Sequence, residues 1–374
     1  MTSLPLKSDG RNIDVTRGTL SGEGAEQVAR NEHAAWENDK RFVFKTEPAA
    51  QSSVSPTYYN RPVLKSGVWT WMIPAYYYVG GLSGGSAVLG AAATLMQREQ
   101  LEVLALRTRW VATGGALVSS VLLVLDLGRP SRFLNMLRVF RPSSPMSMGS
   151  WILVSFSSLA GLSAITQLAP PWARRIGDVS AIASGVFGLG LAGYTGVLVG
   201  NTVVPVWQRA HRMLPVLFLS SAAASTASFF DILGSDGPEH RAVKRFAVAG
   251  KVAELLAANA IEHQVATVAS VVKPLRSGFS GFLWQTGKVL SAASLILSLV
   301  PSKDRRLLRA TGVLGTAGAI CLRFGIHYAG TRSARDPHAT FDQQRSGEGG
   351  YEVTGMAAVT GPGGTRAFEP DAAT

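Results

Sequence analysis

The feature that most constrains this chain is a series of long windows without a charged residue. Five windows hold no Asp, Glu, Lys or Arg: 66–97, 110–125, 146–173, 179–208 and 213–230. A bilayer core needs about 20 apolar residues in helical form, because a helix satisfies its own backbone groups where no water is present. Three weaker windows follow, near 243–271, 280–301 and 305–330. We therefore predict an all-α integral membrane protein, a bundle of about eight transmembrane helices.

Composition supports this class and excludes others. Only 16% of the residues are charged and 47% are hydrophobic, whereas soluble domains carry about 25% charged residues. The 36 basic and 24 acidic residues leave a net charge of +12, which alone would favour nucleic-acid binding. The apolar windows instead indicate the lipid bilayer as partner, with no nucleic acid. One cysteine, Cys321, cannot build a disulfide framework, a thiolate zinc site or an iron–sulfur cluster.

The chain divides into three expected parts. Residues 1–65 form a polar N-terminal arm without an apolar run, within which a short helix is plausible over 26–42. Residues 66–330 form the transmembrane bundle, and residues 331–374 a polar, mostly disordered tail. Basic residues divide almost evenly between the loops of the two membrane sides, so the positive-inside rule assigns no orientation.

The start of the first window is crowded with aromatic residues and followed by glycines. Trp69–Tyr78 holds tryptophans and tyrosines typical of the membrane interface, where an apolar ring meets water through its N–H or O–H. Gly80–Gly85 holds two pairs of glycines four residues apart, which let a second helix come close. The segment serves either membrane anchoring and helix packing, or the binding of a flat ring between the aromatics and the glycine face.

A basic loop follows the second window. In Leu125–Arg138, Asp126 lies within reach of two arginines at the point where the helix leaves the bilayer. One interpretation is a solvated loop with an ion pair at the lipid headgroups. The other is a docking surface for an acidic partner, formed by Arg129, Arg132, Asn135 and Arg138.

The window near 243–271 is unusual because it carries five polar or ionisable residues: Lys251, Glu254, Asn259, Glu262 and His263. At 100° per residue these five side chains cover roughly half of the helix circumference. Ionisable groups at membrane depth usually face the bundle interior. They form either a proton path through Glu254 and His263 or a structural Lys251–Glu254 ion pair with polar residues near the helix end. Asp231, Arg323 and His327 are single candidates near helix ends, for which a structural role is the simpler interpretation.

Four motifs in order resemble the NrfD/PsrC family of integral membrane subunits of polysulfide, nitrite, dimethyl sulfoxide and formate-type oxidoreductases. They are Trp71–Gly85, Asp126–Arg138, Ser143–Trp151, and Gly193–Gly196 with Val204–Trp207. The resemblance is close from about 66 to 233 and looser to 345. It implies an eight-helix anchor in the bacterial plasma (inner) membrane that binds a quinone, menaquinone or ubiquinone. Electrons would pass to or from a peripheral, ferredoxin-like iron–sulfur subunit, which contacts a molybdopterin-type catalytic subunit. By the same resemblance, this chain would hold no haem, metal or iron–sulfur cluster and would not be the main catalytic subunit.

The resemblance also implies where the quinone binds: on the membrane face shared by the first helix and the end of the fourth. Tyr194 lies about 10 Å inside that fourth helix, and its phenol bonds either a neighbouring backbone group or a quinone carbonyl. Asp126 is the nearest proton acceptor, since quinol oxidation releases protons. The expected quinone-binding residues are Trp71, Tyr77, Asp126, Arg129 and Tyr194, and the expected proton-transfer residues are Asp126, Glu254 and His263.

Two other functions compete with this one. A haem-b cytochrome anchor needs paired histidines on facing helices, and of the six histidines only His263 and His327 lie well within the predicted membrane helices. A stand-alone transporter would show discontinuous helices and internal repeats, neither of which the sequence indicates.

Overall fold

The structure is a computed structural model whose chain divides into two compact units, Met1–Thr57 and Tyr58–Thr374. It describes residues 12–14, 19–21, 62–65, 67, 69–96, 99–127, 130–301 and 304–345. In the first unit, the described residues form two short antiparallel strands, β1 (Asn12–Asp14) and β2 (Thr19–Ser21). The helix expected over 26–42 and the tail from 346 lie outside the described residues.

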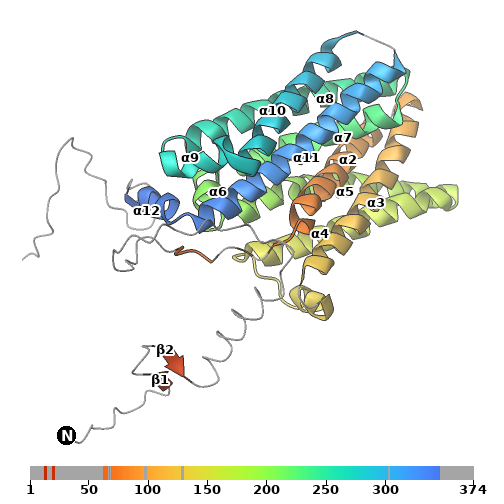
Figure 1. Cartoon of the computed structure of the whole chain (residues 1–374). Helices are drawn as coiled ribbons and strands as arrows, with labels where there is room; N and C mark the ends of the chain where they lie inside the picture. The colour runs from red at the N-terminus through yellow and green to blue at the C-terminus, as the bar shows by residue number, and fades with distance from the viewer. Residues whose placement is uncertain are drawn as a thin grey trace, which may run out of the picture. The chain divides into compact units, whose positions relative to one another are not determined.

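Long helices make up most of the second unit (Figure 1). Within the described part of the chain, eight helices have 20 or more residues: α2 (Met72–Leu95), α3 (Glu102–Asp126), α4 (Pro145–Ile165), α5 (Pro171–Gly200), α7 (Leu214–Leu233), α8 (Gly237–Val265), α10 (Gly278–Leu299) and α11 (Arg305–Arg335). The shorter helices are η2 (Glu99–Leu101), η3 (Pro130–Leu137), η4 (Thr166–Leu168), α6 (Pro205–Arg209), α9 (Ala269–Arg276) and α12 (Pro337–Arg345).

Six of the long helices, among the residues described, are long and apolar enough to cross a bilayer: α3, α4, α5, α7, α10 and α11. The other two do not meet that standard, because tyrosines and glycines dilute the apolar residues of α2 and charged residues interrupt α8. The multi-pass, all-α membrane fold is confirmed. The expected number of eight membrane-crossing helices is not confirmed, although a long helix occupies each of the eight predicted windows.

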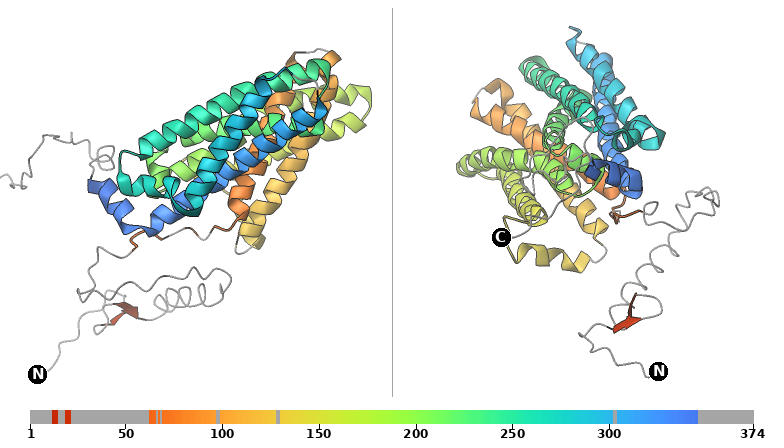
Figure 2. Two further views of the ribbon diagram at one scale, coloured as in Figure 1. Left: turned by 45° about the horizontal axis from the view of Figure 1, so that its top comes forward. Right: turned by 90° about the vertical axis from the view of Figure 1, so that its left-hand side faces the viewer.

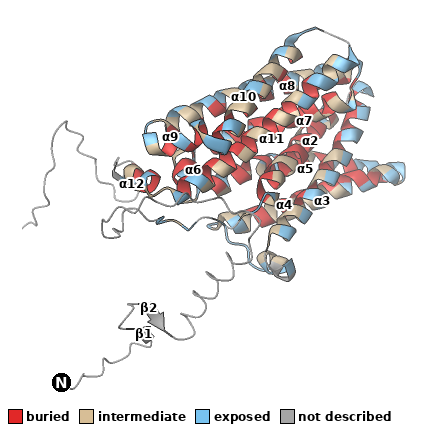
Figure 3. Cartoon of the chain, viewed as in Figure 1, coloured by how far each residue is buried: buried red, intermediate tan, exposed pale blue. Residues whose placement is uncertain are grey.

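The central helix of the bundle is α2, which packs against α3, α5, α7 and α11. The long helices run side by side in the left view of Figure 2. Buried residues line their inward faces (Figure 3), and many of these are small polar residues such as Ser83 and Ser225, both 0% exposed. Large apolar side chains point outward instead: Val186 is 67% exposed and Ile296 64%. This distribution suits a protein surrounded by hydrocarbon, because lipid does not penalise exposed apolar groups.

Glycines on α2 allow its close contacts, which confirms the packing interpretation of Gly80–Gly85. A Cβ atom added at Gly84 would lie 2.5 Å from the carbonyl oxygen of Gly188 on α5. One added at Gly85 would lie 2.8 Å from the carbonyl oxygen of Ala222 on α7. Only a residue without a side chain fits at either position.

Substituting Gly84 by alanine should therefore destabilise the bundle by about 1–3 kcal/mol, the usual effect of overpacking. Gly114→Ala on α3 is the matched control, because nothing lies within 4 Å of a Cβ atom there. Thermal unfolding in detergent measures both variants. Equal unfolding midpoints for the two would contradict the close approach of α2 and α5.

The bundle extends beyond residue 330, where the tail was expected to begin. α11 ends at Arg335 and α12 follows to Arg345. Ala334 and Ala339 are buried, and the backbone N–H of Val206 donates to Ser333 Oγ at 3.4 Å. Burial against α6 thus keeps this polar segment helical.

The bundle has two ends, named A and B. End A carries η3, α6, α9 and α12, together with the start of α2 and the ends of α3 and α5. End B carries η2, η4 and the first turns of α8, together with the ends of α2 and α10. The helices alternate in direction between the two, so sequence motifs far apart in the chain meet at end A.

Candidate functional site

A buried aromatic cluster lies at end A. It consists of Trp69, Tyr77, Trp207 and His327, from the segment before α2, from α2, from α6 and from α11. The rings of Trp69 and Trp207 are stacked with centroids 5.7 Å apart. The His327 ring lies 6.0 Å from that of Tyr77 and 6.1 Å from each indole. Trp207 is fixed by a hydrogen bond from its Nε1 to the carbonyl oxygen of Ile326, 2.8 Å long.

Two polar atoms of this cluster have no hydrogen-bond partner among the described residues: Tyr77 Oη and His327 Nδ1. Both residues are only 2% exposed. Buried polar groups are nearly always paired, and an unpaired one needs a physical explanation such as a ligand or an unseen water. A phenol and an imidazole together can donate to, or accept from, an oxygen of a ring ligand held against the indoles.

Asp126 closes the same end of the bundle. As the last residue of α3, it accepts hydrogen bonds at Oδ1 from the backbone N–H of Thr70, at 3.1 Å, and from Thr70 Oγ1, at 2.6 Å. Its carboxylate and the Tyr194 phenol are near enough to Tyr77 to interact electrostatically. The structure thus brings three of the five expected quinone-binding residues to one place. Trp71 also lies at end A, but it is 58% exposed.

Tyr194 is held by the backbone of a neighbouring helix. Its hydroxyl donates to the carbonyl oxygen of Pro145, at the start of α4. The ring packs so closely over Gly149 that no Cβ atom would fit there. Of the two roles that the sequence left open for this phenol, the structure contains the backbone hydrogen bond.

The expected docking residues are partly described. Asn135, in η3, and Arg138, directly after it, are both exposed at end A. Arg129 and the side chain of Arg132 lie outside the described residues. The ion pairs expected between Asp126 and these arginines therefore stay a prediction.

Arg323 is a buried cation in the middle of the bundle. Its Nε donates to Ser221 Oγ at 3.2 Å, one terminal nitrogen donates to the carbonyl oxygen of Phe218 at 3.2 Å, and the other donates to that of Tyr77. The guanidinium thereby joins α11 to α7 and α2. A Cβ atom at Gly81 would lie 2.6 Å from it, so the glycine makes room for the cation. The expectation that Arg323 lies near a helix end was wrong, because α11 continues to Arg335.

Two further ionisable residues follow on α8. Glu254 Oε2 accepts from Ser291 Oγ at 2.9 Å, while Oε1 has no partner among the described residues. Lys251 Nζ donates to Ser298 Oγ at 2.9 Å. Both residues are 0% exposed, and each bonds a serine of α10. The structure forms no direct Lys251–Glu254 ion pair within the part of the chain it describes, although the two charges are close enough to interact.

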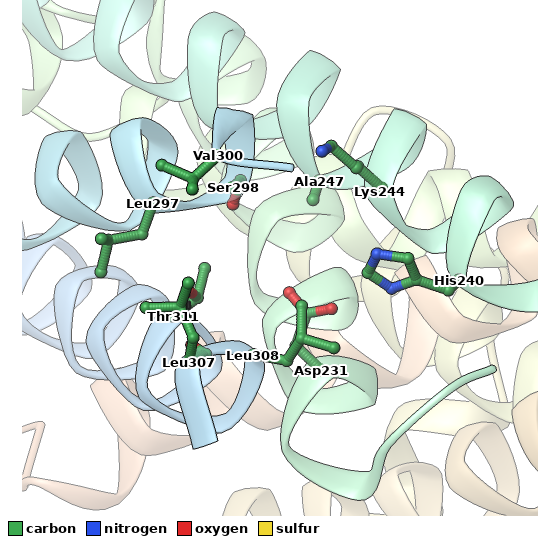
Figure 4. A pocket seen from close by; sticks show the side chains of 10 residues that line it. All are labelled: Asp231, His240, Lys244, Ala247, Leu297, Ser298, Val300, Leu307, Leu308 and Thr311. Carbon is green, nitrogen blue, oxygen red and sulfur yellow. Dashed lines mark hydrogen bonds between the residues drawn. The ribbon is translucent and has the colours of Figure 1, made fainter. Parts of the chain in front are cut away.

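These groups continue a line of polar side chains across the bundle. Ser221, which bonds Arg323, also lies close to Glu254. Beyond Lys251, at end B, Asp231, His240 and Ser298 line a small cavity of about 10 Å³ (Figure 4). A space of this size holds about one water molecule. The described polar groups therefore run from Tyr77 near end A to Asp231 and His240 at end B.

His263 does not belong to this line, because its side chain is exposed. Its neighbour Glu262 forms an ion pair with Lys288 of α10 and lies 3.9 Å from Arg276. His327 is enclosed by the aromatic cluster, so His263 and His327 do not form the facing pair that a haem would need. Among the described residues, no group of three or more His, Cys, Asp and Glu is arranged to hold a metal ion.

From the sequence, Arg323 and His327 were single candidates for which a structural role was preferred, and Trp207 had no site role. Trp207 was quoted only within a family motif, and Lys288 was not singled out at all. The available signal was the cost of placing an ionisable residue inside an apolar window, which applies to both Arg323 and Lys288. The contacts of Trp207 with Trp69 and His327 join residues more than 100 positions apart, and no local pattern predicts them.

Together these features define a multi-pass helical membrane protein with ionisable groups in its interior and a buried aromatic cluster at one end. Residues 60–333 match the family described as polysulphide reductase, NrfD. The chain belongs to the NrfD family, a family of membrane subunits of respiratory oxidoreductase complexes. A comparison with curated proteins finds no matching relative.

Proposed function

We propose that this chain is the quinone-binding membrane anchor of a multi-subunit oxidoreductase, and that it serves electron exchange between the quinone pool and a peripheral iron–sulfur subunit. The observation that carries the proposal is the pair of buried, unpartnered polar atoms, Tyr77 Oη and His327 Nδ1, inside an aromatic cluster at end A. Membership of the NrfD family supports the same function. The quinone, menaquinone or ubiquinone, supplies two-electron chemistry that the side chains of this protein lack.

The residues of end A fit a quinone head group. The indoles of Trp69 and Trp207 offer flat apolar faces, against which a planar ring packs. Tyr77 can donate its hydroxyl proton to a carbonyl oxygen, and the imidazole of His327 can exchange a second hydrogen bond. Asp126 and Tyr194 border this place, and the exposed Trp71 lies at its outer margin; Arg129 stays a proposed member from the sequence alone. Because the Tyr194 hydroxyl already bonds Pro145, we rank Tyr77 above Tyr194 as the ligand donor.

Protons released or taken up at the quinone need ionisable carriers. Asp126 is the carrier nearest the membrane surface at end A. Glu254 is the deeper one, connected to the aromatic cluster through Ser221 and Arg323. His263 is exposed on α8, so we assign it to proton exchange with the surroundings of the protein and not to the line of buried polar residues.

The electron partner would dock at end A, next to the proposed quinone site. The loop containing η3 offers basic and polar groups, Arg129, Arg132, Asn135 and Arg138, for an acidic surface. A single cysteine cannot hold an iron–sulfur cluster, so the one-electron relay belongs to a ferredoxin-like subunit. A molybdopterin-type subunit would complete the complex in the bacterial plasma membrane.

Replacing Tyr77 by phenylalanine tests the proposal. Quinone turnover by the purified complex should fall roughly tenfold, the effect of losing one hydrogen bond to the ligand, while subunit composition stays unchanged. Tyr78→Phe is the matched control, because Tyr78 is the next residue on α2, is less buried and lies outside the aromatic cluster. Steady-state assays with soluble menaquinol and ubiquinol analogues measure both variants, and wild-type rates for Tyr77→Phe would contradict the assignment.

A further inference from the structure

An apolar groove opens at end B, on the opposite side of the bundle from the aromatic cluster. It has a volume of about 420 Å³ and lies between the last turns of α2, η2 with the first turn of α3, and the first turns of α8. Leu89, Met96, Leu104 and Phe246 line it, and Ala249 lies at its deeper end. The volume is in the range of ligand pockets, but the apolar lining offers little to a polar metabolite.

Two arginines border this groove. Arg241 and Arg245 lie one turn apart on α8, line the groove and are both exposed. Neither forms an ion pair with a carboxylate in the described part of the chain. Two other arginines at end B form ion pairs: Arg107 with Glu239 at 3.6 Å, and Arg305 with Asp236 at 3.0 Å. Glu99, in η2, and Glu102, at the start of α3, do not line the groove.

A cationic border above an apolar slot is complementary to one kind of molecule, an anionic amphiphile. The first turn of α3 begins a candidate membrane span, so the arginines lie at the level where lipid headgroups are found. Ala249 lies eight residues beyond Arg241 along α8, which places it about 12 Å deeper. Basic pockets between membrane helices are known to hold phospholipid headgroups.

We propose that this groove binds one anionic phospholipid, with its phosphate between Arg241 and Arg245 and an acyl chain between α2, α3 and α8. Such a lipid would connect α8 to α2 and α3, which precede it by more than 100 residues along the chain, and would cover the apolar residues at their ends. The site is independent of the proposed quinone site, because it lies at the other end of the bundle and shares no residue with it.

The test compares lipid retention by the full-length protein and its variants after purification in mild detergent. Bound phospholipid is extracted and quantified by mass spectrometry. Arg241→Gln combined with Arg245→Gln should lower retention of anionic phospholipid roughly tenfold. Ala249→Trp should lower it similarly by filling the groove without altering charge. The control is Arg174→Gln with Arg175→Gln, because these adjacent arginines are also exposed at end B, at the start of α5, but line no groove; this variant should retain lipid like the wild type.

Added ligands identify the occupant. Phosphatidylglycerol vesicles should raise the thermal unfolding midpoint of delipidated wild-type protein but not that of the double arginine variant. Phosphatidylcholine vesicles or inorganic phosphate alone should have no such effect. The proposal is overturned if the double arginine variant retains wild-type amounts of lipid, if inorganic phosphate stabilises as well as phosphatidylglycerol, or if the extracted molecule is a quinone.

Discussion

Replacing Glu254 by glutamine should slow quinone turnover by roughly 100-fold or more, the usual effect of removing a group that transfers a proton. Glutamine keeps the shape of the side chain and can still accept the hydrogen bond from Ser291 Oγ. It cannot take up or release a proton. The bundle should therefore assemble normally while proton transfer between the aromatic cluster and the interior of the bundle fails.

Glu262→Gln is the matched control for this prediction. Glu262 lies two turns further along α8 and forms an ion pair with Lys288, apart from the line that connects Arg323, Ser221 and Glu254. Its substitution should change turnover by no more than about twofold, because Glu262 lies outside the polar line and because loss of a partly exposed ion pair costs little stability. The measurement is quinone turnover against pH for both variants with unchanged subunit composition. If the two variants lose activity equally, or if neither does, Glu254 is not the proton carrier.

Much of the fold could be predicted from charge alone. Uncharged windows determine where a helix can lie in lipid, and each of the eight windows holds a long helix. The C-terminal boundary was placed too early, because Ala334 and Ala339 are buried by contacts with distant segments. Charge also failed to resolve how many helices cross, because the glycine-rich α2 and the charged α8 lie within the bundle but are not among the helices apolar enough to span a bilayer.

The candidate site was less predictable than the fold. Aromatic residues at the start of α2 are visible in the sequence, but their packing against Trp207 and His327 depends on how α6 and α11 fold back to end A. The roles expected for Tyr77, Asp126 and Tyr194 came from the family resemblance, and the structure adds that the three residues lie near one another. His263 shows the limit of periodicity: its side chain is exposed, whereas that of Val265, two residues further along α8, is buried.

We also expect a large loss of stability when Arg323 is replaced. Arg323→Leu should destabilise the bundle by about 3–5 kcal/mol, the cost of removing one member of a buried polar and charged network. The substitution leaves Ser221 and the carbonyl oxygens of Tyr77 and Phe218 without their donors. It also leaves Glu254 without a nearby positive charge on α11. Arg309→Leu, an exposed position on the same helix, should change stability little.

A double-mutant cycle separates the electrostatic part of that loss from the packing part. If the charge of Arg323 compensates that of Glu254, then Glu254→Gln in the Arg323→Leu background should recover roughly 1–3 kcal/mol, the range found for residues in one network. Unfolding midpoints in detergent titrations measure all four proteins. Purely additive effects would mean that Arg323 acts only as a hydrogen-bond donor between α2, α7 and α11. In that case the role of the guanidinium would be structural, and Arg323 would not be part of the proton path.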